Sequence, residues 1–350
     1  MKAKGNIFFG TMLRMLLRML LSLMALMPLL WSCDAVIYEG EGDCSVTYRV
    51  SFRYVRNIVE ADAFPSQVHS VSLFVFDKAG RFVTSKTESG AALSEPGYAM
   101  EIDVEPGTYD VIAWCGMEEG DSFSLAGGAN PVSKADLVCR MARTAASTSS
   151  VELTPLFHGM AELTFPDEPG VHVAGPVDLT KDTNTIRIVL QSYNGVVLNA
   201  KDFGFTIEDA NGLMDYDNSL MEDDVITYGY WSKNEAVVDV PGTKADIESV
   251  SSVVAEISMA RLVPEHNPVL TVTANNELEP GKDGIVLSLP LKDLLLIARG
   301  EAKRHLSDAD YLDYQDDWTL VFFVTDQRSW YMDAGIYVNG WHMRMQNTDL

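Results

Sequence analysis

Alternating apolar and polar residues dominate the chain from Val46 onward. A period of two is typical of β-strands that bury one face and expose the other. We expect strands at 46–50, 71–76, 100–104, 109–113, 185–191, 203–207, 236–240, 252–261, 269–274, 285–289 and 319–324. Many short strands with little helix predict an all-β protein built from two β-sandwich domains.

Two turn signals predict hairpins. Pro106-Gly107 separates the alternating runs 100–104 and 109–113, which therefore look like the two arms of a β-hairpin. Near the end of the chain, Asn339-Gly340 lies between Ile336-Tyr337-Val338 and Trp341. Asn-Gly favours the two-residue type I′ turn, because both positions must accept a positive φ.

One or two short helices complete the prediction. Residues 133–143 have the composition of a short helix that Ser133 would cap. Leu291 to Arg304 is the best helical candidate, with Leu294, Leu295 and Ile297 on its buried side.

The N-terminus has the three parts of a secretory signal. Four basic residues are followed by an apolar run from Met19 to Leu30, which is shorter than a membrane-spanning helix of roughly 20 residues. Leu30-Trp31-Ser32-Cys33 resembles a bacterial lipobox, although Trp31 is bulkier than usual. We therefore predict a signal peptide at 1–32 and a covalent lipid on Cys33. An ordinary cleaved signal and an uncleaved anchor remain as alternatives.

The remaining chain divides into a tether and two domains. Residues 33–45 are acidic and contain glycine, which suits a short tether. Pro166-Asp167-Glu168-Pro169-Gly170 resembles a break between domains. We predict an N-terminal sandwich at 46–165 and a C-terminal sandwich at 166–350, in line with the length of the chain.

The charge excludes one class of partner. Removal of residues 1–32 takes away four of the 26 basic residues and none of the 50 acidic ones, so a formal charge of −28 remains. Nucleic-acid binding requires clustered Lys and Arg side chains, and the acidic mature chain argues against it. Solubility is the simplest reason for this acidity.

Three cysteines remain if Cys33 carries lipid. Cys44, Cys115 and Cys139 allow one disulfide in three different pairings, with one thiol left over. The sequence does not choose among these pairings.

Catalytic motifs are absent from the sequence. The six histidines are scattered, without the HxxxH spacing of zinc enzymes, and there is no GxSxG elbow or phosphate-binding loop. We predict that the protein is not an enzyme and carries no cofactor other than the lipid. A hydrolase with an unfamiliar site remains the alternative.

One acidic loop contains candidate metal ligands. Oxygen-bearing side chains gather at Asp209, Asn211, Asp215 and Asp217. The loop fails as an EF-hand, because Leu213 replaces a donor and the closing glutamate is missing. A calcium loop of another type is one interpretation, and a β-turn at Asn211-Gly212 is the other.

Aromatic residues have two interpretations as well. Five tryptophans on or near strands can form a sugar-stacking platform or belong to the core, and core is the commoner role. They are Trp114, Trp231, Trp318, Trp330 and Trp341. His158 is interpreted as a structural histidine at the end of a strand.

Several fragments resemble a known family in their order and spacing. The fragments are Ala61–Phe64, Leu73–Asp77, Pro106–Tyr109, Leu156–Gly159, Leu179–Lys181, Asp209–Gly212, Ser258–Leu262, Tyr311–Asp313 and Ile336–Trp341. Together they resemble the fimbrial anchor lipoproteins (FimB-type minor fimbrillins) of bacteroidete type V pili. The resemblance implies two transthyretin-like sandwiches and a lipidated, non-enzymatic subunit. Such a subunit holds the fimbrium on the outer membrane and limits its length.

The expected partners follow from this resemblance. An incomplete sandwich can accept a strand from another fimbrial subunit, and the lipid would bind the outer membrane, with the protein exposed on the cell surface at the fimbrium base. The candidate polymer-facing element is the C-terminal hairpin with Trp330, Ile336, Val338, Asn339, Gly340 and Trp341. The alternative for this hairpin is an ordinary edge hairpin that closes the second sandwich. The alternative function for the protein is that of a surface or fimbrial-tip adhesin that binds a glycan or a host protein.

Overall fold

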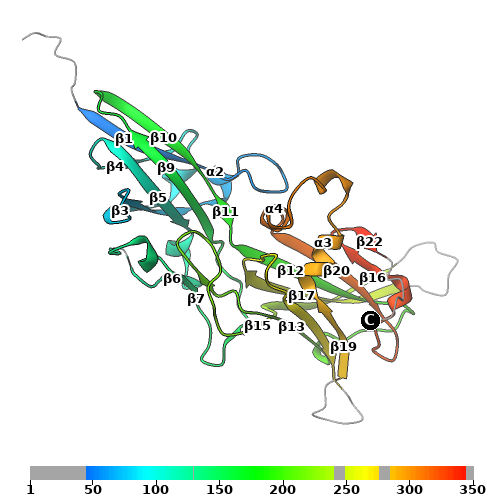
Figure 1. Cartoon of the computed structure of the whole chain (residues 1–350). Coiled ribbons are helices and arrows are strands. Elements are labelled where there is room, and N and C mark those ends of the chain that lie inside the picture. Colours follow the sequence, from blue (N-terminus) through cyan, green and yellow to red (C-terminus); the bar gives the residue numbers. More distant parts are fainter. Residues whose placement is uncertain (1–44, 129, 240–248, 276–283, 344–350) are drawn as a thin grey trace, which may run out of the picture. The chain divides into compact units, whose positions relative to one another are not determined.

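The computed structural model describes residues 45–128, 130–239, 249–275 and 284–343 (Figure 1). The predicted signal peptide, Cys33, Cys44 and nearly all of the tether lie outside these residues. By their contacts, the residues from Val46 onward form one unit.

Two sheets from the first half of the chain face each other across a core. A three-stranded sheet has the order β10-β1-β4, and a five-stranded sheet has the order β11-β9-β5-β2-β3. The strands are β1 Val46–Arg53, β2 Ser70–Phe76, β3 Phe82–Ser89, β4 Ala99–Ile102, β5 Gly107–Cys115, β9 Phe157–Phe165, β10 Gly170–Asp178 and β11 Thr180–Lys181. Val50, Leu73, Val75 and Val111 are fully or almost fully buried between the sheets. These are the inward positions of the alternating pattern.

Two larger sheets form the second sandwich. They have the orders β16-β17-β12-β20-β21-β22 and β19-β18-β13-β15-β8. The strands are β8 Thr148–Ser149, β12 Thr183–Ser192, β13 Phe203–Asp209, β15 Ile226–Gly229, β16 Ser232–Asp239, β17 Ser249–Ala260, β18 Val269–Ala274, β19 Gly284–Pro290, β20 Asp317–Val324, β21 Ile336–Val338 and β22 Trp341–Met343. Ile188, Ile207, Leu270 and Leu320 are completely buried in its core.

A small sheet covers the outer face of the first five-stranded sheet. It has the order β14-β7-β6, with β6 Phe123–Leu125, β7 Cys139–Met141 and β14 Leu213–Met214. Phe74, Ile112 and Trp114, on that outer face, join Met141 in a hydrophobic cluster that continues into the second sandwich. β2 is therefore buried on both faces, which explains its nearly continuous apolar sequence.

The prediction for residues 100–113 is wrong in its pairing. β4 pairs with β1, and β5 pairs with β2 and β9, so Pro106-Gly107 carries the chain from one sheet to the other. Both strands bury one face in the same core, so apolar and polar residues alternate in them as they would in the two arms of a hairpin. Periodicity reports which face is buried and does not report which neighbour is hydrogen-bonded.

The helices are shorter than predicted. Residues 133–143 contain a single 3₁₀ turn, Lys134–Asp136, closed by a capping box between Ser133 and Asp136, and then continue as β7. The helix expected at 291–304 is α3 Leu291–Ile297, followed by a 3₁₀ turn at Glu301–Lys303. Within the described ranges, the other helices are α2 Phe64–Gln67 and α4 Asp308–Tyr314. The same ranges contain further 3₁₀ turns at Ala91–Ser94, Met117–Glu119, Ala200–Asp202 and Met332–Ala334.

The all-β class and the sandwich construction are confirmed. The boundary at 165/166 stays a prediction, although strand pairing crosses it. β10 pairs in parallel with β1, and β8 pairs with β15 of the second sandwich. Between β11 and β12, at Asp182, the chain passes from the five-stranded sheet of the first sandwich to the six-stranded sheet of the second.

Candidate functional site

The C-terminal hairpin closes one edge of the six-stranded sheet. β21 pairs with β20, and β22 pairs only with β21 among the described strands. Asn339 and Gly340 have φ values of 48° and 81°, which confirms the predicted turn. The Asn339 side chain accepts a hydrogen bond from the Thr319 backbone N–H at 2.7 Å and so holds the turn against β20.

Residues of the hairpin divide between core and surface. Ile336 and Val338 are completely buried, and Trp330 packs edge-on against Phe322 with ring centroids 6.0 Å apart. Trp341 is 62% exposed. The hairpin is therefore an integral sheet edge with one large exposed aromatic, and its contact with a polymer stays a prediction.

Two further tryptophans are structural. Trp114 and Trp318 are completely buried, which agrees with the core interpretation for these two. Trp318 also packs edge-on against Tyr311 and donates from Nε1 to Asn184 at 3.4 Å. Because both rings are completely buried, neither is available to a ligand.

An open groove lies at one side of the first sandwich. A cavity of about 480 Å³ is bordered by β3, β4 and the start of β1. Leu73, Val75 and Ile102 form its apolar floor. The five-stranded sheet extends to β3, whereas the opposite sheet ends at β4, so the two sheets differ in width. We call this cavity the β3–β4 groove.

Among the described strands β4 pairs only with β1, and a lysine caps its other, free edge. Lys86 on β3 donates from Nζ to the backbone carbonyl of Glu101 at 2.7 Å and pairs with Glu88 at 2.8 Å. The Glu101 carbonyl therefore points away from β1, and its N–H points the same way in an extended strand. Lysines at sheet edges discourage unwanted strand pairing, and Lys86 has the position for this role.

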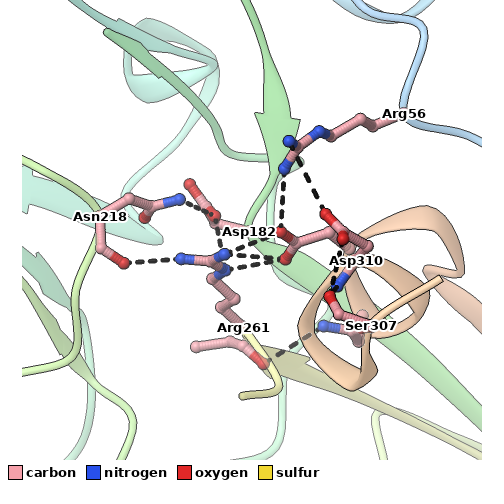
Figure 2. Close-up of polar contacts among 9 residues, drawn as sticks. Arg56, Asp182, Asn218, Arg261, Ser307 and Asp310 are labelled. Carbon is pink, nitrogen blue, oxygen red and sulfur yellow. Dashed lines mark hydrogen bonds and ion pairs between the residues drawn. The ribbon is translucent and has the colours of Figure 1, made fainter. Parts of the chain in front are cut away.

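A buried ionic cluster joins loops of both halves of the chain (Figure 2). Arg261, after β17, donates two hydrogen bonds of 2.9 Å to the Asp313 carboxylate on α4 and one of 2.7 Å to the Asn218 carbonyl. Arg56, after β1, contacts Asp313 at 3.3 Å. We call Arg56, Asp182, Asn218, Arg261 and Asp313 the Arg261 cluster. No sequence motif marks it, because its members are separated by long stretches of chain.

Asp182 is the most deeply buried member of the Arg261 cluster. It accepts a hydrogen bond from the Asn218 amide at 2.8 Å and lies 3.7 Å from Arg261. Burial raises the pKa of Asp182 to about 7, against the opposing effect of Arg261. Desolvation dominates because Arg261 is hydrogen-bonded to Asp313 rather than to Asp182.

The change Asp182→Asn is expected to flatten the pH dependence of stability. Because the folded pKa of about 7 exceeds the unfolded value of 3.8, the folded state holds the proton more tightly. This contribution is complete below about pH 4 and is lost as the pH rises to 7, with a slope of up to about 1.4 kcal/mol per pH unit. Thermal unfolding between pH 4 and 8 should therefore show the variant gaining stability relative to wild type as the pH rises.

The matched control for Asp182→Asn is Asp178→Asn, at an exposed carboxylate that pairs with Arg53. This change should leave the pH profile close to that of wild type. Equal profiles for Asp182→Asn and wild type would contradict the assignment of the proton to Asp182.

His158 has a structural environment. It lies in β9, is almost fully buried, and makes a 2.9 Å hydrogen bond from Nε2 to the Tyr216 carbonyl. Its ring packs edge-on against Trp114 at 4.6 Å. Burial lowers the pKa of His158 to about 4, so the ring stays neutral at physiological pH and can donate to the carbonyl.

Side chains of the 209–218 loop are used within the fold. Asp209 contacts His266 at 3.0 Å, and Asn211 bridges the Tyr228 hydroxyl at 2.6 Å and the Arg261 carbonyl at 2.9 Å. Asp215 and Asp217 accept hydrogen bonds from nearby residues of the same loop. Among the described residues, no group of three or more His, Cys, Asp or Glu side chains is arranged to hold a metal ion.

Two of the four cysteines lie in strands that the structure describes. Within the described part of the chain, Cys115 and Cys139 are buried in strands β5 and β7 and form no disulfide. Cys44 lies outside that part. None of the helices described here is long and apolar enough to cross a membrane.

Comparison with known proteins identifies relatives along most of the chain. The family model of the fimbrillin-A associated anchor proteins Mfa1 and Mfa2 matches residues 41–347. A curated relative, the minor fimbrium anchoring subunit Mfa2 of Porphyromonas gingivalis, is 20% identical over 219 residues. These residues are 60% of this chain and 66% of the relative, so the match spans slightly less than two thirds of the relative's length.

Solved structures share the fold. A candidate polysaccharide-binding protein from Bacteroides thetaiotaomicron has 29% identity and a TM-score of 0.73, over 87% of this chain and 99% of its own. A candidate adhesin from the same organism has 27% identity and a TM-score of 0.74, over 85% and 97%. The structure of P. gingivalis Mfa2 has 15% identity and a TM-score of 0.61, over 87% and 100%, a similarity of fold. Because the family model covers most of its length, this chain belongs to the fimbrillin-A associated anchor protein family.

Proposed function

We propose that this protein is a lipid-anchored minor fimbrial subunit that attaches the fimbrium to the outer membrane and limits its length. The observation that carries the proposal is the position of the family match, which begins at residue 41. Cys33 lies eight residues before this start, and the predicted tether at 33–45 leads into the matched region. The chain would therefore hold its lipid at one end and a folded fimbrial domain at the other.

The lipid would supply the hold on the membrane. Each buried methylene contributes roughly 0.8 kcal/mol, and stable anchoring requires two acyl chains or a second attachment. The formal charge of −28 after removal of residues 1–32 argues against electrostatic binding to anionic lipid. Attachment would then depend on acylation of Cys33 alone.

The change Cys33→Ala is expected to release the protein and its fimbriae into the medium, because the acyl chains would be lost. Immunoblots of washed cells and culture medium, with electron microscopy of the medium, would measure the release. Cys44→Ala is the matched control and should stay on the cells. Retention of the Cys33 variant and its fimbriae on washed cells would refute the proposal.

The β3–β4 groove supports attachment to a pilin by strand addition. A strand placed beside β4 would hydrogen-bond to its free edge and widen the three-stranded sheet toward the width of the opposite sheet. Its inward side chains would cover Leu73, Val75 and Ile102, the apolar floor of the groove. Lys86 would have to leave the Glu101 carbonyl first.

A second candidate function is ligand recognition by a surface or tip adhesin. The relatives described as a candidate adhesin and a candidate polysaccharide-binding protein favour it, as does the exposed indole of Trp341. Immunogold labelling of isolated fimbriae would separate the two functions. Label at the tip would favour the adhesin, and label at the cell-proximal end would favour the anchor. Neither function requires catalysis, and the family and its structural relatives are described as fimbrial and adhesin proteins.

A further inference from the structure

Trp341 lies at the rim of a pocket that the proposed strand addition at the β3–β4 groove does not use. It pairs with Val338 across the Asn339-Gly340 turn, so both side chains point to the core face of the sheet. Val338 is buried there, whereas Trp341 extends beyond the core and stays exposed. Its ring lies against Gly300, where the Cβ atom of any other residue would lie only 3.3 Å from the indole. The absence of a side chain at Gly300 allows this close contact.

Aromatic and amide side chains line the pocket. Its volume is about 360 Å³, at the smaller end of the range for small-molecule sites. Tyr311 and Tyr314 of α4 line it together with Trp341, and Gln315 and Asn339 contribute amides. We call this cavity the Trp341 pocket.

The two amides each have one group engaged by the fold. Asn339 uses its oxygen to accept from the Thr319 N–H, and Gln315 uses its nitrogen to donate to the Asp317 carbonyl. Among the described residues, the NH₂ group of Asn339 and the oxygen of Gln315 have no hydrogen-bond partner, so they are the groups left for a ligand. The pocket can offer one neutral donor and one neutral acceptor beside an aromatic surface.

The charges at the pocket are paired with opposite charges nearby. Lys303 forms an ion pair with Glu60 and lies 5.1 Å from the centre of the Tyr314 ring. Glu301 pairs with Arg304 at 2.8 Å. Because the charged side chains lining the pocket are balanced, it favours neither an anion nor a cation. It suits a neutral ligand that has one apolar face and several hydroxyl groups.

We propose that the Trp341 pocket binds a neutral saccharide. A sugar ring would place its C–H face on the indole of Trp341 and direct hydroxyls to the amides of Asn339 and Gln315. Aromatic rings supply a large rigid apolar surface of this kind at a low entropic cost. The inference rests on the second candidate function and does not require the membrane anchor.

The test is saturation-transfer NMR on the full-length protein in detergent, with neutral oligosaccharides of glucose, mannose, galactose and N-acetylglucosamine. We expect saturable binding of at least one oligosaccharide, and at least tenfold weaker binding to Trp341→Ala. Tyr193→Ala is the matched control, because Tyr193 is also an exposed aromatic, packed against Tyr331 at 4.1 Å. This control should bind as wild type does.

A second variant distinguishes a loss of saccharide binding from a loss of folding. Gly300→Ala would place a methyl group against the indole and shift it, so weaker binding with an unchanged unfolding temperature is expected. Binding of no neutral oligosaccharide, or equal binding by wild type and both variants, would overturn the proposal. Loss of pilin binding by Trp341→Ala without any saccharide binding would make the pocket a protein-docking site and would also overturn it. Each of these failures leaves the Cys33 experiment unaffected.

Discussion

Replacement of Arg261 by leucine is expected to lower the free energy of unfolding by about 3–5 kcal/mol. The guanidinium is mostly buried and makes a bidentate contact with Asp313 while it lies 3.7 Å from Asp182. Its removal would leave the buried Asp182 carboxylate without a nearby cation and Asp313 with only the partly exposed Arg56. Urea unfolding at pH 7.5 would measure the loss as a lower midpoint.

The control for this change is Arg187→Leu, which removes a more exposed ion pair with Glu256. Pairs of this kind contribute about 0–1 kcal/mol, so the control should change little. The double change Arg261→Leu with Asp313→Leu should recover part of the loss, because it removes a stranded charge. A loss for Arg261→Leu no larger than that of the control would show that the Arg261 cluster does not stabilise the fold.

The change Glu101→Pro is expected to remove attached fimbriae while the protein itself stays on the outer membrane. This result rests on the proposed strand addition at the β3–β4 groove. The Glu101 N–H points to the free edge, so proline there should spare the pairing of β4 with β1. It would remove a donor and place its ring where an added strand must lie. We expect at least a tenfold fall in cell-bound fimbriae, counted by electron microscopy.

Glu101→Ala is the control, because it removes the same carboxylate and keeps the backbone N–H. Lys86→Ala should have the opposite effect and strengthen strand addition, since it uncaps the Glu101 carbonyl. An unfolding temperature of Glu101→Pro close to that of wild type would exclude simple misfolding. Normal fimbriation in that variant would contradict strand addition at β4. Because Cys33→Ala is expected to release the protein itself, the two experiments separate the proposed anchor from the proposed acceptor.

Local signals in the sequence were sufficient for several elements. The period of two predicted β12, β13, β17, β18 and β20 within a few residues of their observed ends. Asn339-Gly340 predicted its turn, because few other dipeptides accept positive φ at both positions. Each of these features depends on neighbouring residues alone.

Other expectations failed because two structures satisfy the same local pattern. The runs in β4 and β5 alternate as hairpin arms do, yet they face each other across a core. Residues 139–141 were predicted as helix and form β7, because β6 and β14 lie on either side of them. Strand partners are a long-range property, and the alternation of a strand does not encode them.

The alternating faces, the terminal turn, the candidate lipobox at Cys33 and the resemblance to fimbrial anchors can all be read from the amino-acid sequence. Three-dimensional packing sets which strands are neighbours, opens the β3–β4 groove, and exposes Trp341 while it buries Trp318. Packing also brings Arg56, Arg261 and Asp313 together. Hydrophobic periodicity shows which side of its own strand each residue faces, and this depends on the local sequence. Grooves and ion clusters arise where segments far apart in the sequence pack together.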